Sequence, residues 1–404
     1  MSQSTPAESL GCGASAPLRG LRVLDLSRVL AGPFCTMILA DLGADVVKIE
    51  RPGSGDDSRH FGPFLPDGLS AYFASVNRGK RSVTLDLARD EDTQLFIRLV
   101  ERADVLVENF RPGTMDGFGF SPARLKELNP RLISASVSGF GRTGEHGQRA
   151  AYDIIIQALS GLMSITGADP RHPVRVGTSI SDILSGLFTA IGILAALRNR
   201  EATGHGADLD LAMLDCTVAA LENAISRFEV TGQVPQPLGT RHASITPFQA
   251  FETADRPIVI AAANDGLWIK LCEAVGCAKL GHDPRFLTNP LRTANVVILE
   301  SLLNERLRRQ PAAHWLSRLQ TAGVPVAPIC TIAEVAADSH FAARGMLHTM
   351  VGDAQTKFTT AGSPFRIDGV LPQLSSHAPG LGEHTEHVLR DWLGQSSLLS
   401  DEGQ

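Results

Sequence analysis

The sequence predicts an α/β protein whose larger domain is a doubly wound parallel sheet. Two observations lead to this fold class. Over the first half of the 404-residue chain, short apolar segments typical of buried strands alternate with longer helical segments, as in parallel sheets covered by helices. This alternation breaks at the polar segment 231–246, which contains two prolines and two glycines. We therefore expect a linker there and a second, smaller α+β domain after it.

The expected elements follow one another as strand, helix and strand. The first unit is a strand at Leu21–Leu26, a helix from Gly32 to Leu42 that Gly43 ends, and a strand at Val46–Glu50. The later strands are expected at Ser82–Asp86, Val105–Glu108, Leu132–Val137 and Ala207–Leu211, and the later helices at Asp90–Arg102, Pro122–Leu128, Leu214–Glu229 and Thr385–Leu393. Connection rules favour a doubly wound arrangement for this order.

The expected domain boundaries follow from the same reading. Residues 1–17 are small and polar and are expected to form a disordered leader. Residues 18–227 form the first part of the large domain and 228–326 the small domain, which includes a hairpin-like stretch at Phe248–Ala263. Residues 327–404 are expected to return to the large domain, so both chain ends build it.

Composition narrows the function classes. The formal net charge is −6, which disfavours nucleic acid and anionic membranes as partners. The six cysteines show no CxxC pair and no histidine partners at metal-ligand spacing, so neither disulfides nor a metal site is expected. The longest uncharged run, Ile183–Leu197, is shorter than the roughly 20 residues of a membrane span. A cytoplasmic protein is expected.

One aspartate stands at the start of that uncharged run. Asp182 precedes Ile183 at the expected N-terminus of a helix, where the first backbone N–H groups favour negative charge. We expect its carboxylate to stay ionised at neutral pH and to be a competent nucleophile toward a carbonyl. The alternative is that Asp182 only caps the helix. Asp153 is interpreted as the cap of a helix at Ile154–Ser160, and the alternative is a second acid.

Basic and polar side chains gather around the expected strand ends. Arg28 follows the first strand and Arg51 the second; the others are Arg78, Lys80 and Arg81 before the third strand, and Asn109 and Arg111 after the fourth. Together they indicate a polyanion site for a phosphorylated cofactor, although each alone is typical of a solvated surface charge. The turn after the first strand reads SRVLAGP and lacks the GxGxxG pattern, which disfavours a dinucleotide cofactor.

Several long segments, in fixed order from about Leu18 to Leu393, resemble the class III CoA-transferases (the CaiB/BaiF family). They read RVLDLSRVLAGPFCTMILADLGADVVKIERPGSGD, NRGKRSVTLDL, ADVLVENFRPG, YDIIIQALSG and LGEHTEHVL, together with the Asp182 helix. The resemblance implies transfer of CoA from an acyl-CoA to a carboxylic acid. In that reaction Asp182 forms a mixed anhydride and then an aspartyl-CoA thioester, without a resident cofactor. It also implies a Rossmann-like large domain and an interlocked homodimer.

The resemblance also assigns site residues. The expected CoA contacts are Arg28, Val29, Ala31, Arg51, Lys80, Asn109, Phe110 and Arg111. The chain departs from the family at Leu30, Gly117 and Ser138, where members carry Gln, Arg and Lys. The candidate contacts to the acyl group or the acceptor are Phe140, Tyr152, Arg241 and His242.

Two alternatives to CoA transfer are weighed. Racemases of this family place a histidine where this chain has Tyr152, and a tyrosine is poorly suited to reversible proton exchange at neutral pH. This favours transfer over an α-methylacyl-CoA racemase. A non-catalytic acyl-CoA-binding protein is the other alternative. The segment GTRHASITPFQ lacks the glycine-rich loop of formyl-CoA transferase and is similar to transferases that pair succinyl-CoA with small dicarboxylates. Oxalate and formate are therefore not expected.

Overall fold

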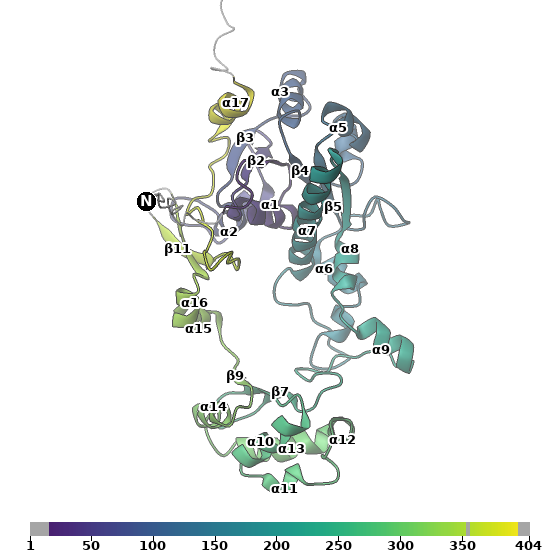
Figure 1. Ribbon diagram of the computed structural model, residues 1–404, viewed down its shortest axis with the longest axis vertical. Coiled ribbons are helices and arrows are strands. Elements are labelled where there is room, and N and C mark those ends of the chain that lie inside the picture. Colours follow the sequence, from purple (N-terminus) through teal and green to yellow (C-terminus); the bar gives the residue numbers. More distant parts are fainter. Residues whose placement is uncertain (1–15, 353–355, 395–404) are drawn as a thin grey trace, which may run out of the picture. The chain divides into compact units, whose positions relative to one another are not determined.

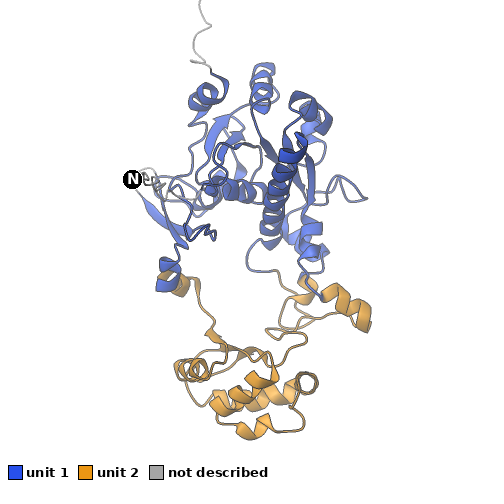
Figure 2. Ribbon diagram, viewed as in Figure 1, with its two compact units in different colours: residues 1–162, 176–223, 339–404 blue, residues 163–175, 224–338 orange. Residues whose placement is uncertain are grey.

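The chain divides into two compact units. The structure is a computed structural model that describes residues 16–352 and 356–394. The first unit consists of Met1–Leu162, Val176–Asn223 and Ser339–Gln404, and the second of Met163–Arg175 and Ala224–Asp338 (Figure 2). The expected boundaries are 228 and 327, whereas the units divide at 224 and 339 and the second also takes 163–175. The expected leader lies outside the described residues, apart from Ala16 and Pro17.

A six-stranded parallel sheet forms the centre of the first unit, in the order β3-β2-β1-β4-β5-β6 (Figure 1). Its strands are β1 (Arg22–Asp25), β2 (Asp45–Glu50), β3 (Arg81–Thr84), β4 (Val105–Glu108), β5 (Ile133–Ser138) and β6 (Asp208–Ala212). The strand order reverses between β1 and β4, and a crevice for a ligand is expected at the carboxyl ends of the strands at such a point. The predicted parallel-sheet α/β fold is confirmed.

Helices cover both faces of this sheet because successive strand residues point to opposite sides. Leu24 of β1 faces a core shared with helices α3, α5 and α17, whereas Val23 faces a core shared with α1 and α7. The α-helices described in this unit are α1 (Ala31–Asp41), α2 (Ala71–Asn77), α3 (Asp90–Val100), α4 (Thr114–Gly117), α5 (Pro122–Leu128), α6 (Asp153–Leu159), α7 (Ile180–Thr203), α8 (Met213–Ala219), α16 (Ser339–Ala343) and α17 (Thr385–Leu393). Doubly wound packing follows from these two cores.

The prediction of a single helix at Leu214–Glu229 is wrong. Helix α8 ends at Ala219, and α9 (Ala224–Thr231) begins the main part of the second unit. Between them Glu222 has a φ of 56°, in the left-handed region that a continuing helix cannot use. The apolar pattern of the sequence continues through this break, so the sequence did not indicate that the helix ends there.

The second unit has its own small sheet and core. Strands β7 (Phe248–Phe251), β8 (Ile258–Ala261) and β9 (Val326–Pro328) pair antiparallel, and the expected hairpin corresponds to β7 and β8. The helices of this unit that pack beside the sheet include α10 (Asp265–Ala274), α12 (Asn289–Ala294), α13 (Val296–Leu307) and α14 (Ala312–Thr321). Trp268, Phe286 and Trp315 are buried in its core.

Helix α7 is, among the described residues, long and apolar enough to cross a membrane by length and composition alone. Core helices pass the same test. Ala190, Ile193 and Ala196 of α7 are buried against the sheet and α1, so this face of the helix belongs to the core. The opposite face carries exposed apolar side chains, among them Leu187 and Ile191.

Candidate active site

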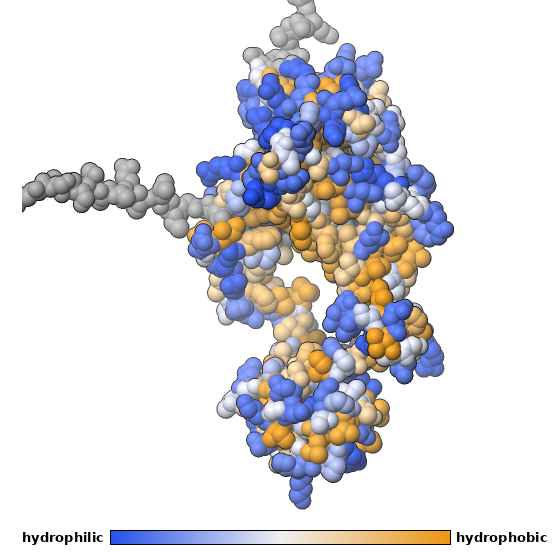
Figure 3. Space-filling view, turned by 45° about the vertical axis from the view of Figure 1, so that its right-hand side comes forward, coloured by the Kyte–Doolittle hydropathy of each residue, from blue (hydrophilic) through white to orange (hydrophobic). Residues whose placement is uncertain are grey.

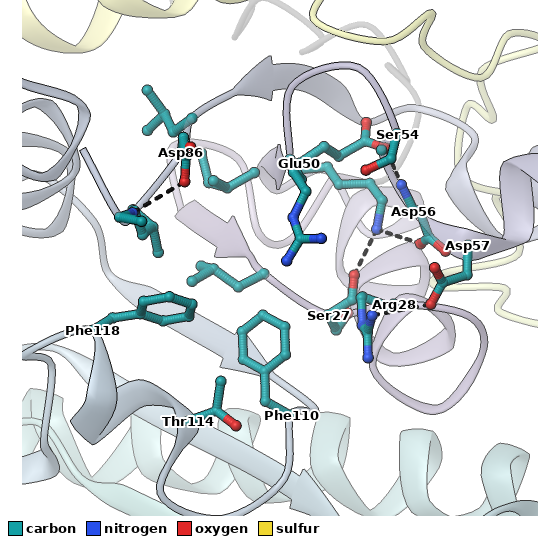
Figure 4. Close-up of a pocket in the computed structure, with 18 of the residues that line it drawn as sticks. Ser27, Arg28, Glu50, Ser54, Asp56, Asp57, Asp86, Phe110, Thr114 and Phe118 are labelled. Atoms are coloured by element: carbon teal, nitrogen blue, oxygen red, sulfur yellow. Dashed lines mark hydrogen bonds and ion pairs between the residues drawn. The ribbon is translucent and has the colours of Figure 1, made fainter.

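A pocket of about 460 Å³ lies where the sheet order reverses. It is lined by residues that follow β1, β2, β3 and β4, such as Ser27, Arg51, Asp86 and Phe110. Phe110 and Phe118 stand on one side of it, and Arg28, Asp56 and Asp57 on another (Figure 4). The pocket therefore combines aromatic surface with charged groups, as an adenine nucleotide with phosphates requires.

A buried lysine holds two of the loops that line the pocket. Lys48 of β2 donates to the carbonyl of Ser27 at 2.7 Å and pairs with Asp56 at 2.8 Å (Figure 4). Burial lowers the pKa of Lys48, but Asp25, Asp56 and Glu50 outweigh it and the net shift is upward. Asp56 in turn accepts the backbone N–H of Val29 at 3.1 Å. Val29 has a positive φ of 66°, and this hydrogen bond fixes its backbone N–H.

Three expected cations do line the pocket: Arg28, Arg51 and Arg111. Arg28 pairs with the exposed Asp57 at 3.0 Å. In the described part of the chain, Arg51 and Arg111 have no ion-pair partner and are exposed. Both are therefore available to an anionic ligand. Phe110 also lines the pocket, with the Arg28 guanidinium 5.8 Å from its ring centre.

The other expected cations have structural partners and do not line this pocket, and the CoA contact at Lys80 stays a prediction. Its ammonium is buried and pairs with Asp25 at 2.9 Å, and burial lowers its pKa to about 8. Arg78 pairs with Asp41 at 2.6 Å, and Arg81 pairs with Asp391 at 2.8 Å. Each of these three cations thus meets an acidic side chain from a distant part of the chain.

The remaining expected CoA residues shape the loop after β1. Asn109 Oδ1 accepts the Arg28 N–H at 2.7 Å, and Asn109 Nδ2 donates to the Arg28 carbonyl at 2.8 Å. Asn109 therefore joins the loops after β1 and β4 and does not itself line the pocket. Ala31 is buried at the start of α1, directly after Val29 and Leu30.

Sequence reasoning missed the stretch Leu85–Ala88, which lines the same pocket. A signal was present, because these residues directly follow β3 as Arg51 follows β2. Among the family departures, Ser138 is buried and its hydroxyl accepts the Gly141 N–H at 3.0 Å. It therefore serves the turn after β5.

Asp182 lies in the first turn of α7, and the capping alternative is wrong. Ser179 is the N-cap residue, and no side chain caps this helix from that position. Within residues 16–352 and 356–394, the Asp182 carboxylate has no hydrogen-bond or ion-pair partner. Asp153 does not cap its own helix either. Its Oδ1 accepts the Ser181 N–H at 2.9 Å, at the start of α7.

The expectation that Asp182 stays ionised at neutral pH needs correction. Burial, and then the charge of Asp153, raise the pKa of Asp182 to about 7. The helix N-terminus favours the charged form by only about 1 kcal/mol, so desolvation and repulsion outweigh it. Near pH 7 the carboxylate is then about half protonated. An anion that is costly to form is also more basic and a stronger nucleophile.

Two features relate Asp182 to the pocket. Gly186, one turn after Asp182, faces the start of α1, where an added Cβ would lie 2.7 Å from the Ala31 carbonyl oxygen. Tyr72 of α2 is the second link, and sequence reasoning missed it. Burial raises its pKa to about 12, with further contributions from Asp182 and from Asp56, which lines the pocket. Its phenol therefore lies within electrostatic reach of both.

The expected substrate residues are divided between the units. In the first, Phe140 is buried beside Ala31, and Tyr152 is 77% exposed at the start of α6. Arg241 and His242 belong to the second unit. There Arg241 pairs with Glu300, and His242 Nδ1 accepts the Ser244 N–H at 3.1 Å.

Comparison with known proteins points to one family. Residues 18–385 match the model of CoA-transferase family III. Acetyl-CoA:oxalate CoA-transferase of Acetobacter aceti is 46% identical over 385 residues, which cover 95% of this chain and 96% of that protein. Succinyl-CoA:mesaconate CoA-transferase of Haloarcula hispanica is 43% identical, covering 92% and 95%.

A solved structure agrees with the sequence matches. The crystal structure of a CaiB/BaiF family protein from Brucella suis superposes with a TM-score of 0.83 at 39% identity. The match covers 94% of this chain and all of that one. At this identity and coverage the similarity concerns the whole chain and not only its sheet.

Proposed function

The chain belongs to CoA-transferase family III, and on that premise we propose that it moves CoA from succinyl-CoA to a small dicarboxylic acid through Asp182. Family membership makes it a CoA-transferase that uses CoA thioesters. The observation that carries the finer proposal is the Asp182 carboxylate. This carboxylate is partly buried and has no hydrogen-bond or ion-pair partner in the described chain. It lies one helical turn from Gly186, which contacts the start of α1.

The proposed steps conserve the energy of one activated acyl bond. An oxygen of ionised Asp182 attacks the thioester carbonyl, the C–S bond breaks, and CoA leaves as its thiolate with succinyl-aspartyl anhydride remaining. The thiolate then attacks the Asp182 carbonyl, which gives aspartyl-CoA thioester and free succinate. The acceptor carboxylate reverses these two steps and leaves as acyl-CoA. The protein must hold the thiolate in place and exclude water, since water would hydrolyse the anhydride.

The names of the relatives support the proposed donor and acceptor. The proteins named as succinyl-CoA:mesaconate and succinyl-CoA:glutarate CoA-transferases are 43% and 36% identical to this chain. They support succinyl-CoA as donor and a dicarboxylate as acceptor. The relative at 46% identity is named for acetyl-CoA and oxalate, so both compounds belong in the substrate panel. We further propose a homodimer, as the family resemblance implies.

Trapping the covalent intermediate tests the proposal. Protein incubated with succinyl-CoA at pH 8 and then treated with hydroxylamine should carry a hydroxamate at Asp182 in a peptide map, and Asp182→Asn should carry none. Full transferase activity in Asp182→Ala would refute the proposal. Solvent deuterium at the acyl α-carbon without an acceptor would instead identify a racemase, and tight acyl-CoA binding without label exchange would identify a binding protein.

A further inference from the structure

Helix α6 holds the start of α7 through one acidic side chain. Asp153 Oδ1 accepts the backbone N–H of Ser181 at 2.9 Å, and Ser181 directly precedes Asp182. The first N–H groups of a helix have no partner within the helix and need one from outside. Asp153 supplies that partner in the turn that carries the nucleophile, so the orientation of this turn depends on a residue from another helix.

Gln157, one turn further along α6, fixes the Asp153 carboxylate. Its Nε2 donates to Asp153 Oδ2 at 2.7 Å, and its Oε1 accepts the Val176 N–H at 2.9 Å. Gln157 is fully buried and Asp153 is 8% exposed. The side-chain pair therefore connects α6 both to the chain that leads into α7 and to the first turn of α7, which leaves Asp153 little freedom to move.

The charge of Asp153 also acts on Asp182, since it contributes to the raised pKa of that group. The ionisable groups of the elements packed against α7 are Cys35 and Asp41 on α1, Asp153 on α6, Asp208 and Asp210 on β6, and Asp215 and Cys216 on α8, with Tyr72 of α2 also in electrostatic reach. Asp41 pairs with Arg78, and Asp208 with Arg142.

We propose that Asp153 is a positioning residue for the nucleophile: it orients the first turn of α7 through Ser181 and places a second negative charge beside Asp182. The inference rests on the proposed function and extends it. Acylation turns the Asp182 anion into a neutral anhydride, so repulsion between the two carboxylates is present before the attack and absent after it. The enzyme thereby makes the free carboxylate more reactive without an additional base.

Two substitutions at this position separate charge from geometry. Asp153→Asn keeps an oxygen acceptor for Ser181 but removes the charge. The acidic limb of kcat/KM for succinyl-CoA, which reports groups of the free enzyme, should move to lower pH by about one unit. Asp153→Glu keeps the charge but moves the acceptor, so the limb should stay in place while kcat falls. An Asp153→Asn enzyme with reduced activity and an unmoved limb would overturn the proposal.

If neither variant folds, direct titration of the Asp182 carboxyl in wild-type protein tests the proposal. In wild-type protein with ¹³C-labelled aspartate carboxyls, the Asp182 signal should titrate near pH 7. An Asp182 signal that titrates near the ordinary aspartate pKa of about 4 would overturn the proposal. Hydroxylamine trapping at pH 8 reports on the nucleophile alone. Absence of the Asp182 hydroxamate there refutes the proposed function, whereas normal trapping with an unmoved limb refutes only the role of Asp153.

Discussion

At the residue scale, the partly buried Asp182 sets a pH dependence of stability. Its pKa of about 7 in the folded protein exceeds the unfolded value near 3.9. The stability associated with the protonated form is therefore present below about pH 4 and is lost as pH rises through 7. We predict that Asp182→Asn is more stable than wild type at pH 8. Its free energy of unfolding, measured by denaturant titration, should be higher by on the order of 1–4 kcal/mol. The difference should shrink toward pH 4, and an equal difference at both pH values would contradict the assignment.

Arg51 gives a second residue-scale prediction, on ligand binding. It lines the pocket and has no ion-pair partner in the described chain. Arg51→Ala should raise KM for succinyl-CoA about tenfold, the loss of one charged hydrogen bond, while kcat changes little. Arg89→Ala is the matched control, because Arg89 is an exposed arginine outside this pocket that pairs with Glu91 at 3.1 Å. Equal effects of the two substitutions would show that Arg51 does not bind the ligand.

The sequence predicts side chains less well than it predicts strands. Arg51 and Arg111 were found because strand-end position in a parallel sheet determines which edge a residue occupies. Lys80 was assigned to the ligand because its charge is visible in the sequence, whereas its partner Asp25 is 55 positions away. The raised pKa of Asp182 was missed for the same reason, since burial and Asp153 are properties of the folded chain. Tyr72 had no sequence signal beyond its residue type.

At the scale of elements, the contact between α1 and α7 connects the pocket to the nucleophile. Gly186 permits it, since an added Cβ would lie 2.7 Å from the Ala31 carbonyl oxygen, which backbone cannot easily avoid. A Cβ added at Gly192 on the same helix would meet only Leu209 Cδ1, at 3.4 Å.

Most of the helices and strands were predictable, because their apolar periodicity is local. The break between α8 and α9 was not, because it depends on the left-handed backbone of Glu222.

We predict that replacing glycine by alanine has opposite effects at positions 186 and 192 of α7. Gly186→Ala should destabilise the protein by about 1–3 kcal/mol through overpacking and should lower kcat, since the turn carrying Asp182 moves. Gly192→Ala should be neutral or stabilising by up to about 1 kcal/mol, because alanine favours helix. Thermal unfolding and steady-state kinetics of both variants provide the measurement. A stable, fully active Gly186→Ala enzyme would show that the two helices need not pack closely.

At the scale of the whole molecule, the apolar outer face of α7 supports the proposed homodimer. Leu187, Phe188, Ile191 and Leu194 are exposed at positions that share one side of the helix. Figure 3 shows that apolar residues also gather on part of the surface of the first unit. A second copy of the chain would remove this surface from water, at roughly 25 cal/mol per Å² of apolar area. Exposed apolar patches of this kind mark protein interfaces.

Light scattering after size exclusion tests the dimer. Wild-type protein should have twice the mass of the 43.1 kDa chain. Ile191→Glu places a charge on a side chain that is 60% exposed in the single chain and should shift the mass toward the monomer. Asn199→Glu, at an exposed polar position on the same helix, should leave the dimer intact. If Ile191→Glu remains a dimer of unchanged stability, this face of α7 is not the interface. A monomeric wild-type protein would contradict the homodimer itself.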